Sequence, residues 1–304
     1  MASLSHRLEY MLARMGMALA CALTPRQADA FGAGLGRMAH RLLGSRRRLA
    51  ADNMRRALGD TLTDGEIQAN VRGVFENLGR TVVELARYRK LGPDGVRAIV
   101  DPAGLEPVRE ALKAGHGVIL ASAHFGNWEV LAATLALNGL PIDALALTQQ
   151  NPLVNDLVQS LRREMGIGIL EVPANARQVF RSLEANRVVF MAADQHASAG
   201  TLVLDFFGRP AAVARGPALF ALRCGCPLIP ILLRRELDGR LVAVSGDTIH
   251  PPEAGAEEEK VRTMTDSYLR FLEGEIRRRP DQWMWTHNRW KLKPLESNPE
   301  SDSA

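Results

Sequence analysis

The sequence has few cysteines, and this shortage excludes a disulfide scaffold. Only Cys21, Cys224 and Cys226 occur in 304 residues, and the last two lack the second pair of ligands that a structural zinc site needs. We therefore expect reduced cysteines that pack in the interior. Such cysteines are typical of the cytosol or of the cytosolic face of a membrane.

A long apolar run is also missing. The most membrane-like segment, Met11 to Leu23, is interrupted by Arg14 and falls well below the ~20 residues that span a bilayer. His6 and Arg7 precede it, so a cleaved signal peptide is the alternative. The pattern favours an amphipathic helix that lies in the membrane interface.

Lysine is scarce, supplying five of the 38 basic residues, so arginine dominates a chain of net charge +4. Most arginines are expected on solvated helix faces, but guanidinium groups also pair well with phosphate and carboxylate. Net charge does not choose between acidic lipid headgroups, an acidic carrier protein and nucleic acid. The arginine clusters are Arg46 to Arg48, Arg55 to Arg56, Arg234 to Arg235 and Arg277 to Arg279.

Several catalytic motifs are absent. There is no Gly-x-Ser-x-Gly around Ser122 or elsewhere, and no Gly-x-x-x-x-Gly-Lys phosphate loop. The glycines from Gly32 to Gly36 lie within a helical pattern instead of following a strand. The sequence therefore favours neither a serine nucleophile of the hydrolase type nor a nucleotide-binding loop.

The periodicity changes once along the chain. The first ninety-odd residues predict helices only, and from Gly117 short β-rich runs alternate with helical stretches, which is typical of an α/β fold with a largely parallel sheet flanked by helices. Helices are predicted at 4–23, 25–43, 45–58, 63–91, 127–138, 152–165, 174–184, 215–224 and 257–279, and strands at 118–121, 142–147, 167–171, 188–192, 228–233 and 241–245. We expect an N-terminal helical, membrane-associating region at 1–92, an α/β core at 93–294 and a disordered tail at 295–304.

His124 is the first candidate for chemistry, because it follows a predicted strand and precedes a predicted helix. Sites in open α/β sheets form at such strand ends. A neutral histidine can accept a proton near pH 7, and a carboxylate partner such as Glu129, five residues on, would orient it. Without further context a histidine there is more often structural, and a glutamate in a first helical turn often serves the helix dipole.

The segment Ala123-His-Phe-Gly-Asn-Trp-Glu129 resembles the bacterial lipid A biosynthesis acyltransferases, the lauroyl and myristoyl transferases of the lysophospholipid acyltransferase superfamily. The resemblance runs from about Arg26 to Lys293 and includes other ordered matches. These are Arg47 to Met54, Asn151 to Leu153 with Arg162, Ala193 to Gln195 with Phe206 to Pro210, and Trp283 to Lys291.

The resemblance implies a glycerolipid-acyltransferase fold, no metal or organic cofactor, and a site on the cytoplasmic face of the bacterial inner membrane. It implies transfer of a fatty acyl group from an acyl carrier protein thioester to a hydroxyl of a lipid A precursor. His124 would be the general base, Glu129 would hold and charge-balance it, and Arg162 would stabilise the oxyanion. Substrate contacts are expected from Asn127, Arg163, Asp194, Gln195, Phe206, Phe207, Gly208 and Arg289.

The implied partners are acyl carrier protein, a glycolipid or phospholipid acceptor and an anionic membrane surface, with no nucleic acid. The acceptor could equally be a lysophospholipid, an aminolipid or a phosphoglycolipid. Two other classes stay open at this point: an inactive lipid-binding protein with the same fold, and a thioesterase-like hydrolase.

Overall fold

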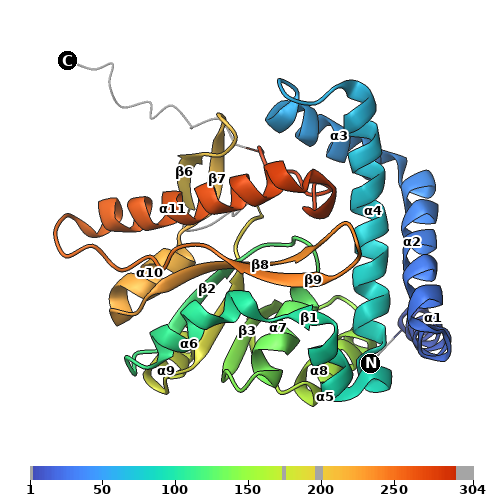
Figure 1. The fold of residues 1–304 in the computed structure, drawn as a ribbon, viewed down its shortest axis with the longest axis horizontal. Coiled ribbons are helices and arrows are strands. Elements are labelled where there is room, and N and C mark those ends of the chain that lie inside the picture. The colour runs from blue at the N-terminus through green and yellow to red at the C-terminus, as the bar shows by residue number, and fades with distance from the viewer. Residues whose placement is uncertain (1–2, 173–175, 196–200, 292–304) are drawn as a thin grey trace.

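A computed structural model describes residues 3–172, 176–195 and 201–291 of the chain. Figure 1 shows a twisted central sheet with helices on both faces, and a set of N-terminal helices packed along one side of it. The predicted disordered tail, 295–304, lies outside the described residues.

The N-terminal helices are amphipathic, and three of the four have a side-chain N-cap. They are α1 (Leu4–Ala22), α2 (Pro25–Leu42), α3 (Gly44–Leu58) and α4 (Asp64–Ala86). Capping boxes that start at Thr24 and Thr63 satisfy the first free N–H groups of α2 and α4. Within the described ranges, no helix is both long and apolar enough to cross a membrane.

Helices α2 and α4 approach each other unusually closely. A Cβ added to Gly36 would lie 2.1 Å from the Phe75 carbonyl oxygen, and one added to Gly79 would lie 2.1 Å from the Gly32 carbonyl oxygen. Only glycine allows the two backbones this contact, so Gly32 and Gly36 of the helical pattern are packing residues.

The sheet has seven strands in the order β1-β9-β8-β2-β5-β3-β4. All neighbouring pairs are parallel except β8 and β9, so the predicted largely parallel sheet is confirmed. The strands are β1 (Val100–Asp101), β2 (Val118–Ser122), β3 (Ile142–Leu147), β4 (Gly168–Val172), β5 (Val188–Ala192), β8 (Leu228–Arg235) and β9 (Leu241–Ser245).

Helices cover both faces of the sheet and form two hydrophobic cores (Figure 1). They are α5 (Tyr88–Ala98), α6 (Glu106–Leu112), α7 (Trp128–Leu137), α8 (Pro152–Glu164), α9 (Ala176–Glu184), α10 (Gly216–Cys224) and α11 (Glu257–Arg278), with short 3-10 turns η1 (Ala103–Leu105) and η2 (Pro280–Gln282).

Several features differ from the sequence-based expectation, and helices α5 and α6 are among the elements that were not predicted. The helix predicted to continue to Leu91 ends at Ala86, because Arg87 turns the chain and its guanidinium binds the carbonyl groups of Ala20 and Leu23. A separate hairpin, β6 (Thr201–Asp205) and β7 (Pro210–Ala214), was not predicted. Strand β1 was also missed, because two residues carry no periodic signal.

Candidate active site

The register of two strands brings the first candidate residues together. Strands β2 and β5 are parallel neighbours in which Ser122 lies opposite Ala192. His124 and Asp194 each follow two residues after these positions, so they emerge side by side at the carboxyl edge of the sheet.

His124 is held by Asp194. The ring Nδ1 of His124 lies 2.8 Å from Oδ1 of Asp194, and the His124 backbone N–H donates to Oδ2 of the same carboxylate at 3.0 Å. This pairing occupies Nδ1 and turns Nε2 towards the cavity side as the nitrogen that can accept a proton. The expectation that Glu129 holds His124 does not match this geometry, since the short hydrogen bonds of Glu129 go elsewhere.

The environment sets the charge states of the pair. Burial by itself lowers the pKa of His124, but the charge and hydrogen bond of Asp194 outweigh it and raise the pKa above the usual value of 6.5. Burial alone would raise the pKa of Asp194, whereas His124, Trp283 and a backbone N–H stabilise the carboxylate and lower it. Asp194 is therefore a buried anion poised to stabilise an imidazolium.

Glu129 forms a two-point ion pair with Arg162. The Arg162 Nε donates to Oε2 at 3.0 Å, and an NH2 group donates to Oε1 at 2.6 Å. Glu129 also contributes, more weakly than Asp194, to the raised pKa of His124. The pair places a rigidly oriented guanidinium on helix α8, facing the first turn of α7.

His124, Glu129 and Arg162 line one cavity of about 640 Å³, here called the catalytic cavity. The side chain of His124 remains 23% exposed there and packs edge-on against Trp128 at 5.0 Å. Apolar side chains from β3, β5 and α10 form much of the wall. The lining includes His124, Trp128, Glu129, Leu145, Gln149, Arg162, Phe190, Gln195, Pro217 and Phe220.

The segment after α11 contacts the loop of residues 123–127, here called the catalytic loop, from outside. The indole N–H of Trp283 donates to Oδ2 of Asp194 at 2.8 Å, and the backbone N–H of Met284 donates to the His124 carbonyl at 3.0 Å. The N–H of Gly126 donates to the Gln282 carbonyl at 3.0 Å. Sequence reasoning noticed these tryptophans as a family match but did not place them at the site.

Helix α4 holds the same loop from the other side. The amide of Asn77 and the hydroxyl of Thr81 both donate to the Gly126 carbonyl, at 2.8 and 3.1 Å. Gly126 has a φ of +54°, and an added Cβ would meet the Leu233 carbonyl oxygen at 1.7 Å. Only glycine therefore fits between His124 and α7.

Asn127 has a structural role and does not line the catalytic cavity. Its side-chain oxygen accepts from the Val130 N–H and caps α7, and its amide donates to Glu84 at 2.5 Å. Glu84 also pairs with Arg235 at 2.8 Å. The expected substrate contact of Asn127 is replaced by this buried network.

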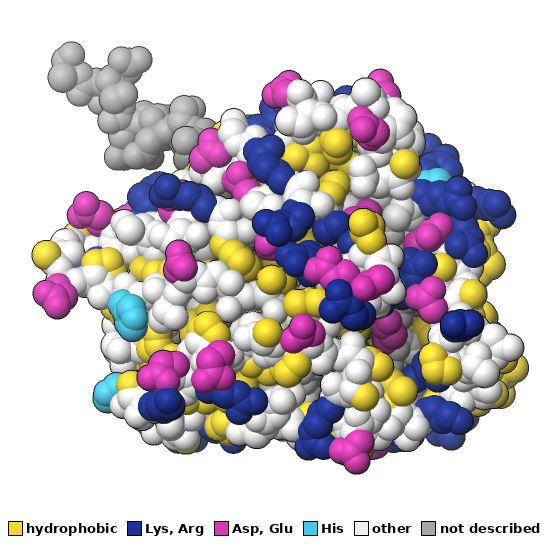
Figure 2. Space-filling view, in the orientation of Figure 1, with side chains coloured by type: hydrophobic (Ala, Val, Ile, Leu, Met, Phe, Trp, Pro, Cys, Tyr) yellow, Lys and Arg dark blue, Asp and Glu magenta, His cyan; other side chains and the backbone are white. Residues whose placement is uncertain are grey.

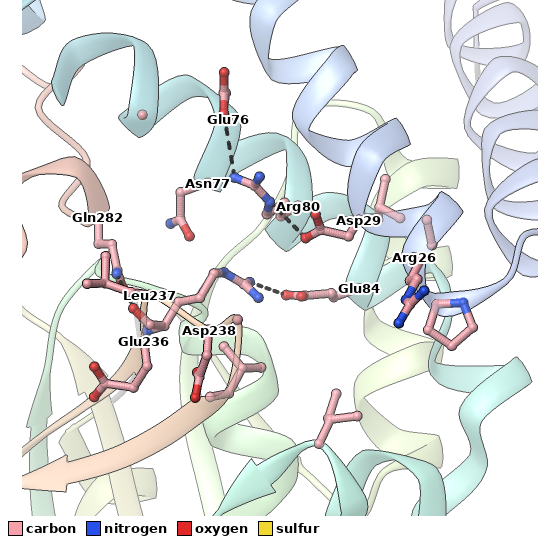
Figure 3. Close-up of a pocket in the computed structure, with 18 of the residues that line it drawn as sticks. Arg26, Asp29, Glu76, Asn77, Arg80, Glu84, Glu236, Leu237, Asp238 and Gln282 are labelled. Atoms are coloured by element: carbon pink, nitrogen blue, oxygen red, sulfur yellow. Dashed lines mark hydrogen bonds and ion pairs between the residues drawn. The ribbon is translucent and has the colours of Figure 1, made fainter. Parts of the chain in front are cut away.

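A second and larger cavity, about 790 Å³, lies behind the loop between α4 and the β8–β9 turn. Figure 3 shows Arg80 between Asp29 and Glu76, and the ion pair of Glu84 across the cavity. These charges neutralise each other locally. The cavity therefore contributes an ion-pair network that ties the N-terminal helices to the sheet.

Other residues that were expected to contact substrate are buried in the interior. Phe206 and Phe207 are buried and pack on the tryptophans after α11, while Gly208 forms the hairpin turn with a φ of +70°. Arg289 is only 1% exposed, donates to the Ala212 carbonyl at 2.6 Å and lies over the Phe206 ring. This burial does not match the expected contact between Arg289 and substrate.

Two expected contacts flank the cavity. Arg163 is exposed on α8 next to Arg162, and the Gln195 amide lies 3.4 Å from Nδ1 of His124. Among the described residues, no group of three His, Cys, Asp or Glu side chains is arranged to hold a metal ion.

Comparison with known proteins gives one family over almost the whole chain. The family described as bacterial lipid A biosynthesis acyltransferase matches residues 2–292. The lipid A biosynthesis lauroyltransferase of Escherichia coli (strain K12) is 23% identical over 265 residues, which cover 86% of this chain and 85% of the relative. The E. coli lipid A biosynthesis myristoyltransferase is 26% identical over 286 residues, covering 91% and 86%.

A relative named for a different acceptor has a comparable identity over a shorter stretch. The phosphatidylinositol mannoside acyltransferase of Mycolicibacterium smegmatis is 25% identical over 195 residues, which cover 63% of this chain and 62% of that protein. The chain thus matches less than two thirds of the length of this relative.

Proposed function

Because the chain belongs to the bacterial lipid A biosynthesis acyltransferase family, we propose that it transfers a fatty acyl chain from an acyl carrier protein thioester to a hydroxyl of a lipid A precursor. The observation that carries the proposal is the buried Asp194 carboxylate on Nδ1 of His124, in a cavity that also holds the Glu129–Arg162 pair.

His124 acts as the general base. Its Nε2 takes the proton of the acceptor hydroxyl while the hydroxyl oxygen attacks the thioester carbonyl carbon. Asp194 keeps the proton on Nδ1 and stabilises the imidazolium that forms. The tetrahedral intermediate then expels the thiolate, which takes the proton from Nε2, so the products are an ester and a free thiol. General-base help of this kind is worth roughly 10²–10⁴-fold in rate.

Arg162 stabilises the oxyanion. Its Nε and one NH2 group are engaged by Glu129, and NH1 is directed to Gln159 at a long 3.4 Å. A guanidinium held at two points keeps its remaining N–H groups in a fixed plane, which suits a charge that develops during the reaction. Glu129 is a positioning residue for Arg162 in this scheme.

A phosphoglycolipid is the second candidate acceptor. The similarity to a phosphatidylinositol mannoside acyltransferase, at an identity close to that of the lipid A enzymes, favours keeping it. Both acceptors are glycolipids that offer a hydroxyl, so the same proton transfer serves either.

The protein works at an anionic membrane surface on the cytoplasmic side of the inner membrane, with residues 1–92 as the membrane-associating region and residues 93–294 as the catalytic region. Helix α1 supports this placement, because it exposes a stripe of apolar side chains: Leu4, Leu8, Met11, Leu12, Met15 and Leu19. Figure 2 shows Lys and Arg side chains gathered where α2 meets α3. Each basic side chain near an anionic surface adds on the order of 1 kcal/mol to binding.

The test is transfer of a radiolabelled acyl chain from acyl carrier protein to a panel of acceptors, with the His124→Ala variant as control. We expect labelled lipid A precursor, and no product above background with the variant. Label only in a phosphatidylinositol mannoside would move the proposal to the second acceptor. Free fatty acid as the sole product in the presence of every acceptor would contradict acyl transfer and favour a hydrolase.

A further inference from the structure

A second groove, here called the helical groove, lies between the N-terminal helices and the segment after α11. It has a volume of about 470 Å³. Most of its lining is apolar: Leu35, Gly36, Ala39 and Leu43 from α2 and its end, Phe75, Leu78, Gly79 and Val82 from α4, and Met284, with Arg46, Gln195, Thr286 and His287 as polar members. Of the described residues that line the catalytic cavity, only Gln195 also lines this groove.

The helical groove reaches the catalytic loop. Gln195 lines both the helical groove and the catalytic cavity, and its amide lies 3.4 Å from Nδ1 of His124. Met284, another lining residue, donates its backbone N–H to the His124 carbonyl at 3.0 Å. The two hollows therefore share a wall residue next to the general base.

The outer end of the helical groove is apolar and exposed. On α2 the residues Leu35, Ala39 and Leu43 are spaced by four, and on α4 Leu78 and Val82 are also spaced by four, so each set lies along one helix face. Leu43 is 49% exposed and Val82 is 63% exposed. At Leu43 and Val82 these two helix faces therefore leave apolar surface exposed.

The charges around this end fit an anionic lipid. Arg46 lines the helical groove and donates to the Thr286 carbonyl, and Arg47 and Arg48 follow it in α3. In Figure 2 the Lys and Arg side chains near the junction of α2 and α3 lie beside hydrophobic side chains at the outer edge of the N-terminal helices. An apolar slot with guanidinium groups at its mouth suits a hydrocarbon chain that carries a phosphate-bearing headgroup.

We propose that the helical groove holds a hydrocarbon chain of the membrane-resident acceptor lipid, while the catalytic cavity takes the acyl chain of the donor. This inference rests on the proposed function. A lipid in the bilayer can enter sideways through the exposed apolar end on the N-terminal helices, whereas the donor chain arrives on a water-soluble carrier. The acceptor chain would then guide the reacting hydroxyl of the lipid to His124 past Gln195.

Photochemical labelling tests the assignment directly. The probes are a lipid A precursor and a phosphatidylinositol mannoside, each with a diazirine at the end of one acyl chain, and acyl carrier protein loaded with a diazirine-bearing chain. We expect the acceptor probes to label peptides containing Leu78 or Met284, and the donor probe to label the catalytic cavity around Phe190. Donor label in the helical groove, or no acceptor label there, would overturn the inference.

A variant separates the groove from the chemistry. Val82→Trp adds bulk at an exposed wall position, so folding is expected to persist, and Ala30→Trp makes the same addition at an exposed position of α2 outside the groove. We expect Val82→Trp to raise KM for a long-chain acceptor about tenfold, with KM for the donor and transfer to a short-chain acceptor unchanged. Equal effects of both variants, or an effect on donor KM alone, would refute the groove assignment. Absence of transfer by the unmodified protein would instead refute the proposed function.

Discussion

Replacing Asp194 with asparagine should leave the imidazole of His124 in place but change which of its nitrogens carries the proton. The variant keeps the size of the side chain but removes the negative charge 2.8 Å from Nδ1. An asparagine amide can donate to Nδ1 and so favour the tautomer whose Nε2 already carries a proton. The base would then face the acceptor hydroxyl in the wrong protonation state.

The size of the effect follows from two losses. A hydrogen bond to a charged group is worth about 1.5–3 kcal/mol, and the imidazolium formed in the transition state also loses its counter-charge. Together these give roughly 3–5 kcal/mol, or about 10²–10⁴-fold in kcat. The exposed Asp238, which pairs with Arg240 on the β8–β9 turn, is the matched control as Asp238→Asn and should retain full activity.

The pH profile gives a second and independent readout. His124 must be neutral to act, so kcat/KM of the unmodified protein should rise with pH through its raised pKa. In Asp194→Asn, burial is the strongest remaining influence on His124 and lowers its pKa. The acidic limb of the pH profile of kcat/KM should therefore move to lower pH. The assay is steady-state acyl transfer with a labelled donor between mildly acidic and mildly alkaline pH. Activity within twofold of the unmodified protein, or a limb that moves to higher pH, would refute the role given to Asp194.

Three further results are expected. Trp283→Phe removes one hydrogen bond to the Asp194 carboxylate, worth about 1.5–3 kcal/mol, and should lower kcat by roughly 10- to 100-fold while KM stays constant; an effect on KM alone would contradict this role. Arg162→Lys keeps the charge but breaks the two-point pair with Glu129, so kcat should fall by roughly 10²-fold in the same assay, and an unchanged kcat would remove Arg162 from the oxyanion site. Gly36→Ala forces α2 away from α4 and should cost about 1–3 kcal/mol of unfolding free energy in urea titration, whereas Gly34→Ala, which meets only an arginine side chain at 3.8 Å, should not destabilise the protein.

Much of the fold could be predicted from local patterns. The capping box at Thr63, the helical repeats before residue 90 and the six β-rich runs are local signals, and each corresponds to an element of the structure. The β6–β7 hairpin was missed because its strands are short and its turn, at Phe207 and Gly208, looks like an apolar core segment. Its stability comes from contacts with the tryptophans after α11, which are distant in sequence.

The candidate site was predicted in part, for a physical reason. His124 was found from its position after a strand, but its partner was sought five residues away instead of seventy. The parallel register of β2 and β5 is what brings Asp194 to His124, and strand order is not written in any local pattern. Glu129 and Arg162 were both identified, yet their mutual pairing depends on how α7 and α8 pack and could not be read from spacing.

The Gln282 to Met284 segment also affects the order in which the protein becomes functional during synthesis. The His124 loop leaves the ribosome long before the residues that bind it, since Gln282, Trp283 and Met284 stand near the end of the described chain. A nascent or truncated chain that lacks them therefore has the general base but lacks the indole N–H that donates to Asp194. It also lacks the backbone hydrogen bonds that hold the loop around His124. The arrangement around His124 can therefore assemble only after residues 282–284 have been synthesised.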